Sequence, residues 1–268
     1  MTERYCRRSP GLRPPGRSGR RRPAGEWVRW SSGSSGAELT ESLSGDCEDS
    51  GVSLLDLDEV CRGVLAAPAV SGLRLVGIDG PSGSGKSTLA RRLRTRLPGS
   101  GLVEIDDFLS WADPAWWWPR FEAEVLQPLV EGRAAGYRVR DWSGDEFGTA
   151  LGDWKVQPWA SVVLLEGVGC TRREASPYLA YAIWVDASSE LRLTRGLDRD
   201  GDDHLDVWHR WMTWEQRFFT KDGARDRADL RVDGNPAVPH DPETQLVAEE
   251  PNPDRPASPP RESQTGAA

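Results

Sequence analysis

One nine-residue stretch, Gly80–Thr88, constrains the fold of this chain more than any other feature. It reads GPSGSGKST, so that two glycines five residues apart are followed by Lys86 and Ser87. Glycines let the backbone curl with its amide groups pointing inward, and a helix that starts there directs the positive end of its dipole to the same point. Residues 73–79 before the stretch form an apolar run, and residues 88–97 after it carry leucines at helical spacing. This context predicts a phosphate-binding P-loop and disfavours an accidental Gly/Ser-rich turn.

The P-loop residues have separate expected roles in binding ATP. Backbone amides of residues 82–86 are expected to hold the phosphates, and Lys86 to offset charge on the outer phosphates during catalysis. The Ser87 hydroxyl is expected to ligate Mg²⁺. The predicted ATP-binding residues are Gly80, Ser82, Gly83, Ser84, Gly85, Lys86, Ser87 and Thr88.

Carboxylates follow two further strand-like segments. Asp106 and Asp107 come directly after residues 102–105, and Glu166 ends the apolar run 162–165. In an open parallel sheet the ligand crevice lies beyond the carboxyl ends of the strands, so these carboxylates are placed near the P-loop. Glu166 is therefore predicted to be a second Mg²⁺ ligand, the alternative being an ordinary acid at the end of a strand.

An arginine-bearing helix follows the strand-like segment 181–185. Arg192, Arg195 and Arg199 are spaced three and four residues apart, which places them on one face of the helix. That face is either a solvated, salt-bridged surface or a lid that closes guanidinium groups over the transferred phosphate. Under the second interpretation Arg195 and Arg199 are catalytic.

Residues 137–159 are polar and glycine-rich, and they predict a hairpin or lid on the acceptor side. We expect Asp107, Arg140, Asp141 and Trp142 to bind the acceptor. The chain holds 13 tryptophans. Most are expected in the core, since Trp is largely buried on average, although the indoles at positions 116, 117 and 142 could stack on a base.

Two other segments complete the expected fold. Ser53 begins a capping-box pattern and is expected to start a helix that ends before Pro68. Residues 228–234 are expected to form an edge strand that ends the fold before Pro236. The predicted fold class is α/β: a three-layer α/β/α P-loop NTPase with a mostly parallel sheet and a mobile lid.

The two ends of the chain differ in composition from the middle. Residues 1–36 are rich in Arg, Pro, Gly and Ser, and residues 239–268 in Pro, Glu, Asp and Ser. Such segments cannot bury enough apolar surface to offset the entropy of ordering. We therefore predict a disordered arm over 1–50, a P-loop kinase domain over 51–237 and a disordered tail over 238–268.

Charge and cysteine content limit the class of protein. Residues 1–30 hold nine arginines against Glu3 and Glu26, a net +7, so the rest of a chain with net charge −8 carries −15. An acidic domain disfavours nucleic acid as the main ligand. The four cysteines show neither zinc nor disulfide spacing, and no apolar run is long enough to span a membrane. A cytoplasmic protein is expected, and the sequence leaves the oligomeric state open, a homo-oligomer included.

These motifs together resemble the uridine kinase-like branch of small-molecule P-loop kinases, which includes phosphoribulokinase and bacterial pantothenate kinase. The resemblance covers about residues 53–236, and the motifs that carry it are Gly80–Thr88, Asp106-Asp107-Phe108, Leu165-Glu166-Gly167 and Ile183–Asp186 leading to Arg199-Asp200. It implies that Asp106 is the general base for the acceptor hydroxyl. Two positions depart from the family pattern: Leu109 replaces an aromatic residue, and Gly201-Asp202-Asp203 replaces the Arg-Gly-Arg of true uridine kinases.

The sequence thus predicts an ATP- and Mg²⁺-dependent kinase that transfers the γ-phosphoryl group to a hydroxyl group of a small molecule, most simply a nucleoside. One alternative is a kinase for another acceptor, such as a nucleotide, pantothenate or a sugar phosphate. The other is a nucleotide-binding ATPase or regulator that phosphorylates no small molecule.

Overall fold

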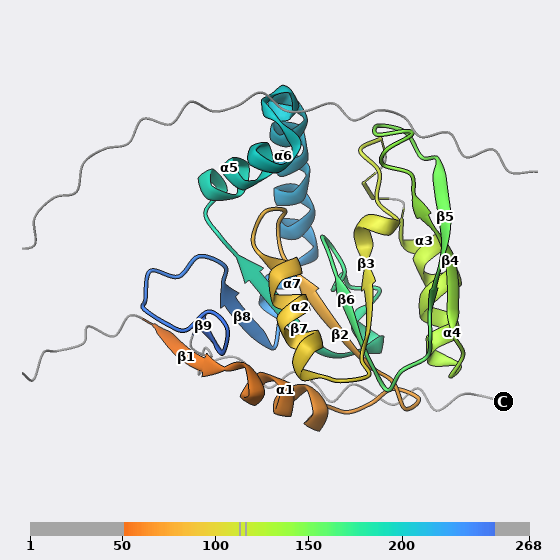
Figure 1. The fold of residues 1–268 in the computed structure, drawn as a ribbon, viewed down its shortest axis with the longest axis vertical. Coiled ribbons are helices and arrows are strands. Elements are labelled where there is room, and N and C mark those ends of the chain that lie inside the picture. The colour runs from red at the N-terminus through yellow and green to blue at the C-terminus, as the bar shows by residue number, and fades with distance from the viewer. Residues whose placement is uncertain (1–50, 113, 116, 250–268) are drawn as a thin grey trace, which may run out of the picture. The chain divides into compact units, whose positions relative to one another are not determined.

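A seven-stranded, mostly parallel sheet forms the centre of the protein in this computed structural model, which describes residues 51–112, 114–115 and 117–249 (Figure 1). The strand order is β1-β9-β8-β7-β2-β6-β3. The five strands from β8 to β3 run parallel, and β9 pairs antiparallel with both β8 and β1. The strands are β1 (Val52–Asp56), β2 (Arg74–Asp79), β3 (Gly101–Glu104), β6 (Val162–Glu166), β7 (Leu179–Asp186), β8 (Leu230–Asp233) and β9 (Gln245–Glu249).

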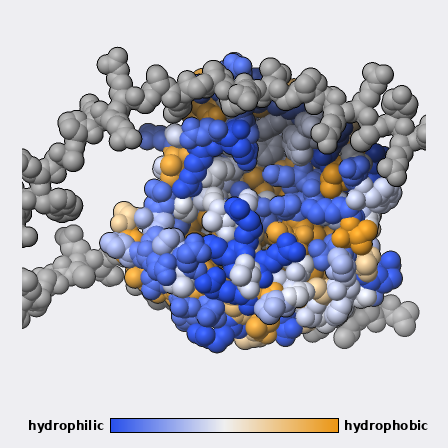
Figure 2. Space-filling view, viewed as in Figure 1, coloured by the Kyte–Doolittle hydropathy of each residue, from blue (hydrophilic) through white to orange (hydrophobic). Residues whose placement is uncertain are grey.

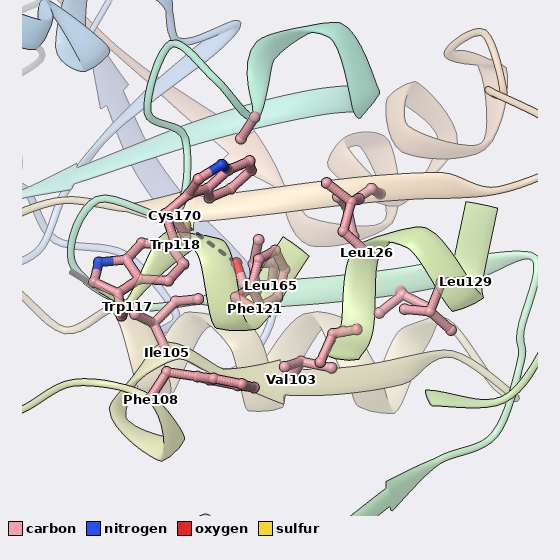
Figure 3. Packing of buried hydrophobic residues seen from close by; sticks show 14 of the residues in the cluster. Val103, Ile105, Phe108, Trp117, Trp118, Phe121, Leu126, Leu129, Leu165 and Cys170 are labelled. Atoms are coloured by element: carbon pink, nitrogen blue, oxygen red, sulfur yellow. Dashed lines mark hydrogen bonds between the residues drawn. The ribbon is translucent and has the colours of Figure 1, made fainter. Parts of the chain in front are cut away.

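Alternation of side chains along the strands divides the core between the two faces of the sheet. Val76 and Ile78 of β2 face a cluster with helices α1 (Leu57–Ala66) and α2 (Lys86–Arg96). Leu75 faces the opposite cluster. In that second cluster β3 and the adjoining turn pack on the helical segment that begins at α3, as Figure 3 shows for Val103, Phe121, Leu126 and Leu129. Helices therefore cover both faces, and the predicted three-layer α/β/α arrangement is confirmed.

The helical segment after residue 117 is continuous but irregular. It comprises α3 (Trp118–Phe121), a π-helical turn Glu122–Leu126 and α4 (Gln127–Val130). Pro128 in α4 has no amide hydrogen to give to a carbonyl one turn back, which accounts for the wider turn before it. A π-helical turn therefore precedes Pro128 in this segment.

A separate two-stranded hairpin follows, formed by β4 (Ala135–Arg140) and β5 (Leu151–Gln157). It stands beside β3, on the opposite side of the sheet's centre from β1 and β9 (Figure 1). The predicted hairpin over residues 137–159 is present.

Helix α5 (Ser189–Asp200) starts three residues after β7, with the Ser188 hydroxyl accepting from the Leu191 amide as its N-cap. A 3₁₀ turn, Asp202–His204, links it to α6 (Leu205–Asp222), and α7 (Ala224–Arg227) leads back to β8. Gly196 lets α5 approach α6, because a Cβ there would lie 2.3 Å from the Trp208 ring. The α5–α6 pair stands beyond the carboxyl end of β7 (Figure 1).

The C-terminal boundary predicted at residue 237 is wrong. Leu246, Val247 and Ala248 of β9 are buried, and β9 lies between β1 and β8 in the sheet. Arg92 and Arg96 of α2 donate to backbone carbonyls of residues 245 and 243. The apolar run is only three residues long, so the polar composition around it concealed a strand. The arm predicted over 1–50 and the rest of the tail, 250–268, lie outside the described residues.

Two other element predictions also need correction. Residues 52–56 form strand β1, and helix α1 is capped by Asp56, whose carboxylate accepts from the Asp58 amide; Ser53 caps nothing. Strand β8 is internal, because β7 and β9 flank it. Both errors come from the strand β9, which the sequence assigned to a tail and which pairs with β1 and β8.

The face seen in Figure 1 is largely hydrophilic, with hydrophobic residues in small patches (Figure 2). Cys61 and Cys170 are buried and free. No helix in the described part of the chain combines the length and apolar character that a membrane span requires.

Candidate active site

The P-loop connects the end of β2 to the start of α2 and lines a cavity of about 590 Å³. Gly80 and Gly83 adopt φ angles of 139° and 78°, which side-chain-bearing residues rarely adopt. A Cβ on Gly80 would lie 2.0 Å from the Val185 carbonyl oxygen, and one on Gly83 would lie 2.7 Å from that of Arg192. Glycine is therefore required at both positions for the loop to pack between β7 and α5.

The amides of the loop divide into two groups. Within the described residues, the N–H groups of residues 83, 85, 86 and 87 have no hydrogen-bond acceptor in the protein. The Ser82 amide donates to Glu215 and the Ser84 amide to the Pro81 carbonyl. The prediction that all amides from 82 to 86 face phosphate is thus wrong for two of them. The four free amides lie at the N-terminus of α2, which is the arrangement that binds anions.

Lys86 is buried, and its ammonium group donates to the Pro81 carbonyl at 2.9 Å. An ammonium group has three donors, so two remain for a ligand in the cavity. Ser87 and Thr88 also line the cavity, whereas Gly80 and Ser84 do not. Gly80 shapes the loop, and the buried Ser84 hydroxyl has no partner among the described residues.

Asp106 and Glu166 line the same cavity as the P-loop, near Lys86. Asp106 lies in a 3₁₀ turn, Ile105–Asp107, which follows β3, and its carboxylate is accessible from the cavity. Loss of water around Asp106 raises the pKa of its carboxyl group, while the positive charges of Lys86 and Arg199 lower it. The raised pKa makes the ionised carboxylate a stronger proton acceptor in the cavity.

Glu166 ends β6 and is buried. Burial raises the pKa of Glu166 to about 7, although Lys86 and the Ser87 hydroxyl lower it. Its carboxylate and the Ser87 hydroxyl are hard oxygen ligands of the kind that Mg²⁺ prefers. No group of three or more His, Cys, Asp or Glu side chains in the described ranges could hold a metal by itself. This fits Mg²⁺, which binds with one or two protein ligands and completes its shell with phosphate and water.

The structure separates Asp107 from Asp106. The Asp107 carboxylate accepts from Lys155 at 2.8 Å and from the Tyr137 hydroxyl at 3.1 Å, and it does not line the cavity. Burial and the neighbouring Asp107 carboxylate raise the pKa of Tyr137. Asp107 thus joins the hairpin to the end of β3, and its predicted contact with the acceptor is not supported by its position.

Only two of the three arginines on this face of α5 reach the cavity. Arg195 and Arg199 line the cavity, as predicted. Arg195 donates to the Gly83 and Gly234 carbonyls, and Arg199 pairs with Asp200 and lies over the Trp208 ring. Arg192 bonds to Ser82 and Glu215 and does not line this cavity.

Of the three remaining predicted acceptor residues, only Trp142 reaches the cavity, and its indole N–H donates to the Asp106 carbonyl at 2.9 Å. Arg140 is buried and donates to four backbone carbonyls of the hairpin loop, those of residues 141, 145, 148 and 150. The Asp141 carboxylate accepts from Ser143 and Gly144, which lowers its pKa. Arg140 and Asp141 therefore shape the hairpin loop rather than touch the acceptor.

Sequence reasoning missed most of the aromatic wall of this cavity, which we define as Trp111, Trp142, Trp208 and Trp211. Trp208 and Trp211 come from α6, and Trp111 and Trp142 come from two separate loops. Trp117, expected as a stacking candidate, is buried in the core, and position 116 lies outside the described residues. His204 and Glu146 complete the rim, with Nε2 of the imidazole 2.5 Å from Oε1 of the carboxylate. No local pattern marks these residues, because they meet only in the tertiary structure.

A second cavity of about 360 Å³ adjoins the first and shares Gly85, Thr88 and Arg195 with it. Its other walls come from α2, from the ends of β7 and β8 and from the residues that follow β8: Leu89, Arg92, Val185, Val232, Asp233, Gly234, Pro236, His240, Pro242, Leu246 and Val247. Part of this cavity is therefore built from the segment that the sequence assigned to a tail. We call the two the acceptor-side cavity and the C-terminal cavity.

No protein-family model and no curated protein sequence matches the chain. Among solved structures it is similar to one described as a possible uridine kinase from Bacillus stearothermophilus, with TM-score 0.50 and 19% identity over 65% of this chain and 96% of that one. It is also similar to phosphoribulokinase from Rhodobacter spheroides, with TM-score 0.42 and 14% identity over 61% of this chain and 70% of that one. The first likeness, together with the parallel sheet and the P-loop at the end of β2, shows that the chain has the uridine kinase-like P-loop kinase fold.

Proposed function

We propose that the protein transfers the γ-phosphoryl group of ATP to a hydroxyl group of a small molecule, most simply a nucleoside. The observation that carries the proposal is the meeting of an anion-binding loop and a carboxylate in one cavity: four free amides and Lys86 of the loop, and Asp106. Phosphoryl transfer depends on positioning and charge stabilisation, and these groups supply both.

The residues divide the work by position. The free amides and Lys86 hold the phosphates, and Arg195 or Arg199 offsets the charge that develops during transfer. Asp106 accepts the proton of the acceptor hydroxyl as its oxygen attacks the γ-phosphorus and the bond to ADP breaks. Ser87 and Glu166 would hold Mg²⁺, which supplies charge neutralisation between the phosphates when bound.

The second cavity supports a place for the rest of the nucleotide. It opens from the same P-loop residues and is walled by aliphatic side chains and proline rings, a surface suited to the flat face of a base. In this arrangement the base of ATP occupies the C-terminal cavity, and the phosphates extend along the P-loop towards Asp106.

The aromatic wall supports an uncharged acceptor with a flat ring. Indole faces stack on any nucleobase, because every base has a π-face. Glu146, Asp200 and His204 supply polar groups at the rim. Arg199 is already paired with Asp200, and Arg195 is bonded to the Gly83 carbonyl of the P-loop, beside the proposed site of the ATP phosphates. A phosphate on the acceptor would therefore meet more carboxylates than unpaired cations, which favours a nucleoside over a nucleotide or a sugar phosphate. The likeness to a possible uridine kinase agrees with this choice.

A screen for ADP release tests the proposal. With ATP and Mg²⁺ present, nucleosides, nucleotides, pantothenate and sugar phosphates are supplied one at a time, and release that depends on a nucleoside is expected. Release that requires a nucleotide, pantothenate or a sugar phosphate would keep the kinase and correct the acceptor. Equal release with no acceptor would overturn the proposal in favour of an ATPase or regulator.

Lys86→Ala is the matched variant for that assay. It removes the cation beside the phosphates, and losses of this kind amount to about 10³-fold or more in phosphotransfer rate. The melting temperature should stay within a few degrees, because the ammonium group serves a ligand. Lys221→Ala, at an exposed position near the end of α6, should retain full activity. An active Lys86→Ala enzyme would remove the P-loop from the mechanism.

A further inference from the structure

A buried carboxylate outside the sequence motifs contacts the P-loop. Glu215 of α6 is only 1% exposed. Its Oε1 atom accepts from the Ser82 amide at 2.7 Å and from the Trp211 indole N–H at 2.6 Å, and its Oε2 atom accepts from Arg192 at 3.3 Å. A charge removed from water in this way is stable only when it is paired and hydrogen-bonded, and three donors meet that need.

Ser82 is held at each of its polar groups. Its amide donates to Glu215, its carbonyl accepts from Arg192 at 3.3 Å, and its hydroxyl accepts from the Trp211 indole at 2.8 Å. The next residue, Gly83, packs against the backbone of Arg192 and carries the first of the four free amides. The Ser82 carbonyl and the Gly83 N–H belong to one planar peptide group, so the bonds that hold Ser82 on both sides set the direction in which the Gly83 amide points.

Trp211 belongs to the aromatic wall as well as to this contact. Its ring meets Trp111 edge-on at 4.9 Å, and Trp111 meets Trp142 in the same manner at 6.2 Å. The Trp142 indole in turn donates to the Asp106 carbonyl. A continuous series of packed indoles thus runs from the P-loop to Asp106.

We propose that Glu215 and Trp211 are positioning residues that fix the Ser82 peptide and so aim the phosphate-binding amides of the P-loop. The pair acts on the nucleotide through the loop, without contact with phosphate. The inference rests on the proposed nucleotide binding, but it concerns residues that neither the P-loop motif nor the likeness to known kinases assigns.

Binding of ADP with Mg²⁺, measured by calorimetry, tests the proposal without any acceptor. Trp211→Phe keeps a ring on the wall and removes the indole donor, and Glu215→Gln keeps the shape and removes the charge. Each is expected to weaken ADP binding by about tenfold, the effect of losing one charge-assisted hydrogen bond. Trp214→Phe is the control, because among the described residues Trp214 makes ring contacts with Trp211 and Phe218 and no hydrogen bond through its indole.

A double-mutant cycle separates positioning from general stabilisation. If both residues act through the Ser82 peptide, the double variant should bind ADP no more weakly than the poorer single variant. Amide hydrogen exchange over residues 80–86 should be faster in both single variants, while Trp214→Phe leaves it unchanged. Lower melting temperatures with unchanged ADP affinity and exchange would show a structural role only and overturn the inference. If the wild-type protein itself fails to bind ADP, the proposed function fails instead, so the two failures are distinguishable.

Discussion

The two cavities that flank the P-loop share three residues but differ in almost everything else. The acceptor-side cavity is lined by carboxylates and indoles, and its walls come from both loops and helices. The C-terminal cavity is lined mainly by glycine, proline and aliphatic side chains, with Arg92, Asp233 and His240 among them, and much of its wall follows β8 directly in sequence. A reactive group can be held in the first and a flat apolar group in the second.

Under the proposed function, this difference assigns the two substrates to different cavities. Charge and proton transfer need ionisable groups whose pKa values the surroundings adjust, and Asp106 and Glu166 both lie in the acceptor-side cavity. A base needs apolar surface, and the aliphatic and proline side chains of the C-terminal cavity offer it beside the charged Arg92 and Asp233. Variants on the two sides should therefore affect different steps of one reaction.

The largest expected effect is on the acceptor side. Asp106→Asn removes the proposed general base and should lower kcat by about 10²–10⁴-fold with ADP binding little altered. Asp107→Asn, at a carboxylate held by Lys155 and Tyr137, should cost about tenfold or less. The measurement is kcat at saturating acceptor, since a binding defect would appear in KM. Inactive Asp107→Asn beside active Asp106→Asn would reverse the assignment of the two carboxylates.

The next effect is on the C-terminal side. Ending the chain at residue 237 removes β9, which carries three buried side chains. Burial of the two larger ones, Leu246 and Val247, stabilises the fold by about 1.5–3 kcal/mol each. The melting temperature should fall by roughly 10 °C or more, and ADP binding should weaken because the cavity loses Leu246 and Val247. Ending the chain at residue 249 should change neither quantity. Equal stability and ADP affinity of the two truncated proteins would show that β9 has no part in the site.

A moderate effect is expected at the aromatic wall. Loss of one stacking face costs about 1–3 kcal/mol, so Trp142→Ala should raise the KM for a nucleoside acceptor by about tenfold or more and leave the KM for ATP unchanged. Trp154→Ala is the matched control, because that side chain is 73% exposed on the outer face of the hairpin. A larger change in the KM for ATP than in the KM for the acceptor would show that the aromatic wall binds ATP instead of the acceptor.

The smallest effect concerns pH at the rim of the acceptor-side cavity. Bonding to Glu146, with the added charges of Asp200 and Asp203, raises the pKa of His204. The paired, protonated form is therefore fully present below the ordinary histidine pKa of about 6.5, and the pairing is lost as pH rises through the raised value. The KM for the acceptor should rise a few-fold between pH 6 and pH 9. His204→Gln should flatten this profile, and His209→Gln should preserve it. An unchanged profile in His204→Gln would show that the His204–Glu146 pair has no part in acceptor binding.

A feature could be predicted from the sequence when the residues that form it are close together in the chain. Gly80, Gly85, Lys86 and Ser87 are adjacent in sequence, and the structure places their loop between strand and helix as predicted. The sequence placed both Asp106 and Asp107 near the P-loop, because they follow the same strand-like segment. The structure separates them through a 3₁₀ turn and through bonds from Lys155 and Tyr137, which no strand pattern could have indicated.

The misplaced elements show the converse. Asp56 caps a helix only because β1 pairs with β9, nearly two hundred residues later in the chain. Arg140 carries a charge in a polar segment, which suggested a ligand, yet its donors satisfy the carbonyls of its own loop. A polar residue is a good candidate for ligand binding only when its donors and acceptors are not already satisfied by nearby backbone groups.

The sequence by itself determined the phosphate-binding loop, the parallel α/β sheet and the strand-end carboxylates, because each depends on glycine conformation, side-chain alternation or strand direction, which are local properties. The tertiary structure decided which amides of the loop remain free, which arginines reach the cavity and which indoles form its wall. Those outcomes depend on hydrogen bonds and contacts between α5, α6, the hairpin and the P-loop, and a buried donor or acceptor takes whichever partner the fold brings within reach.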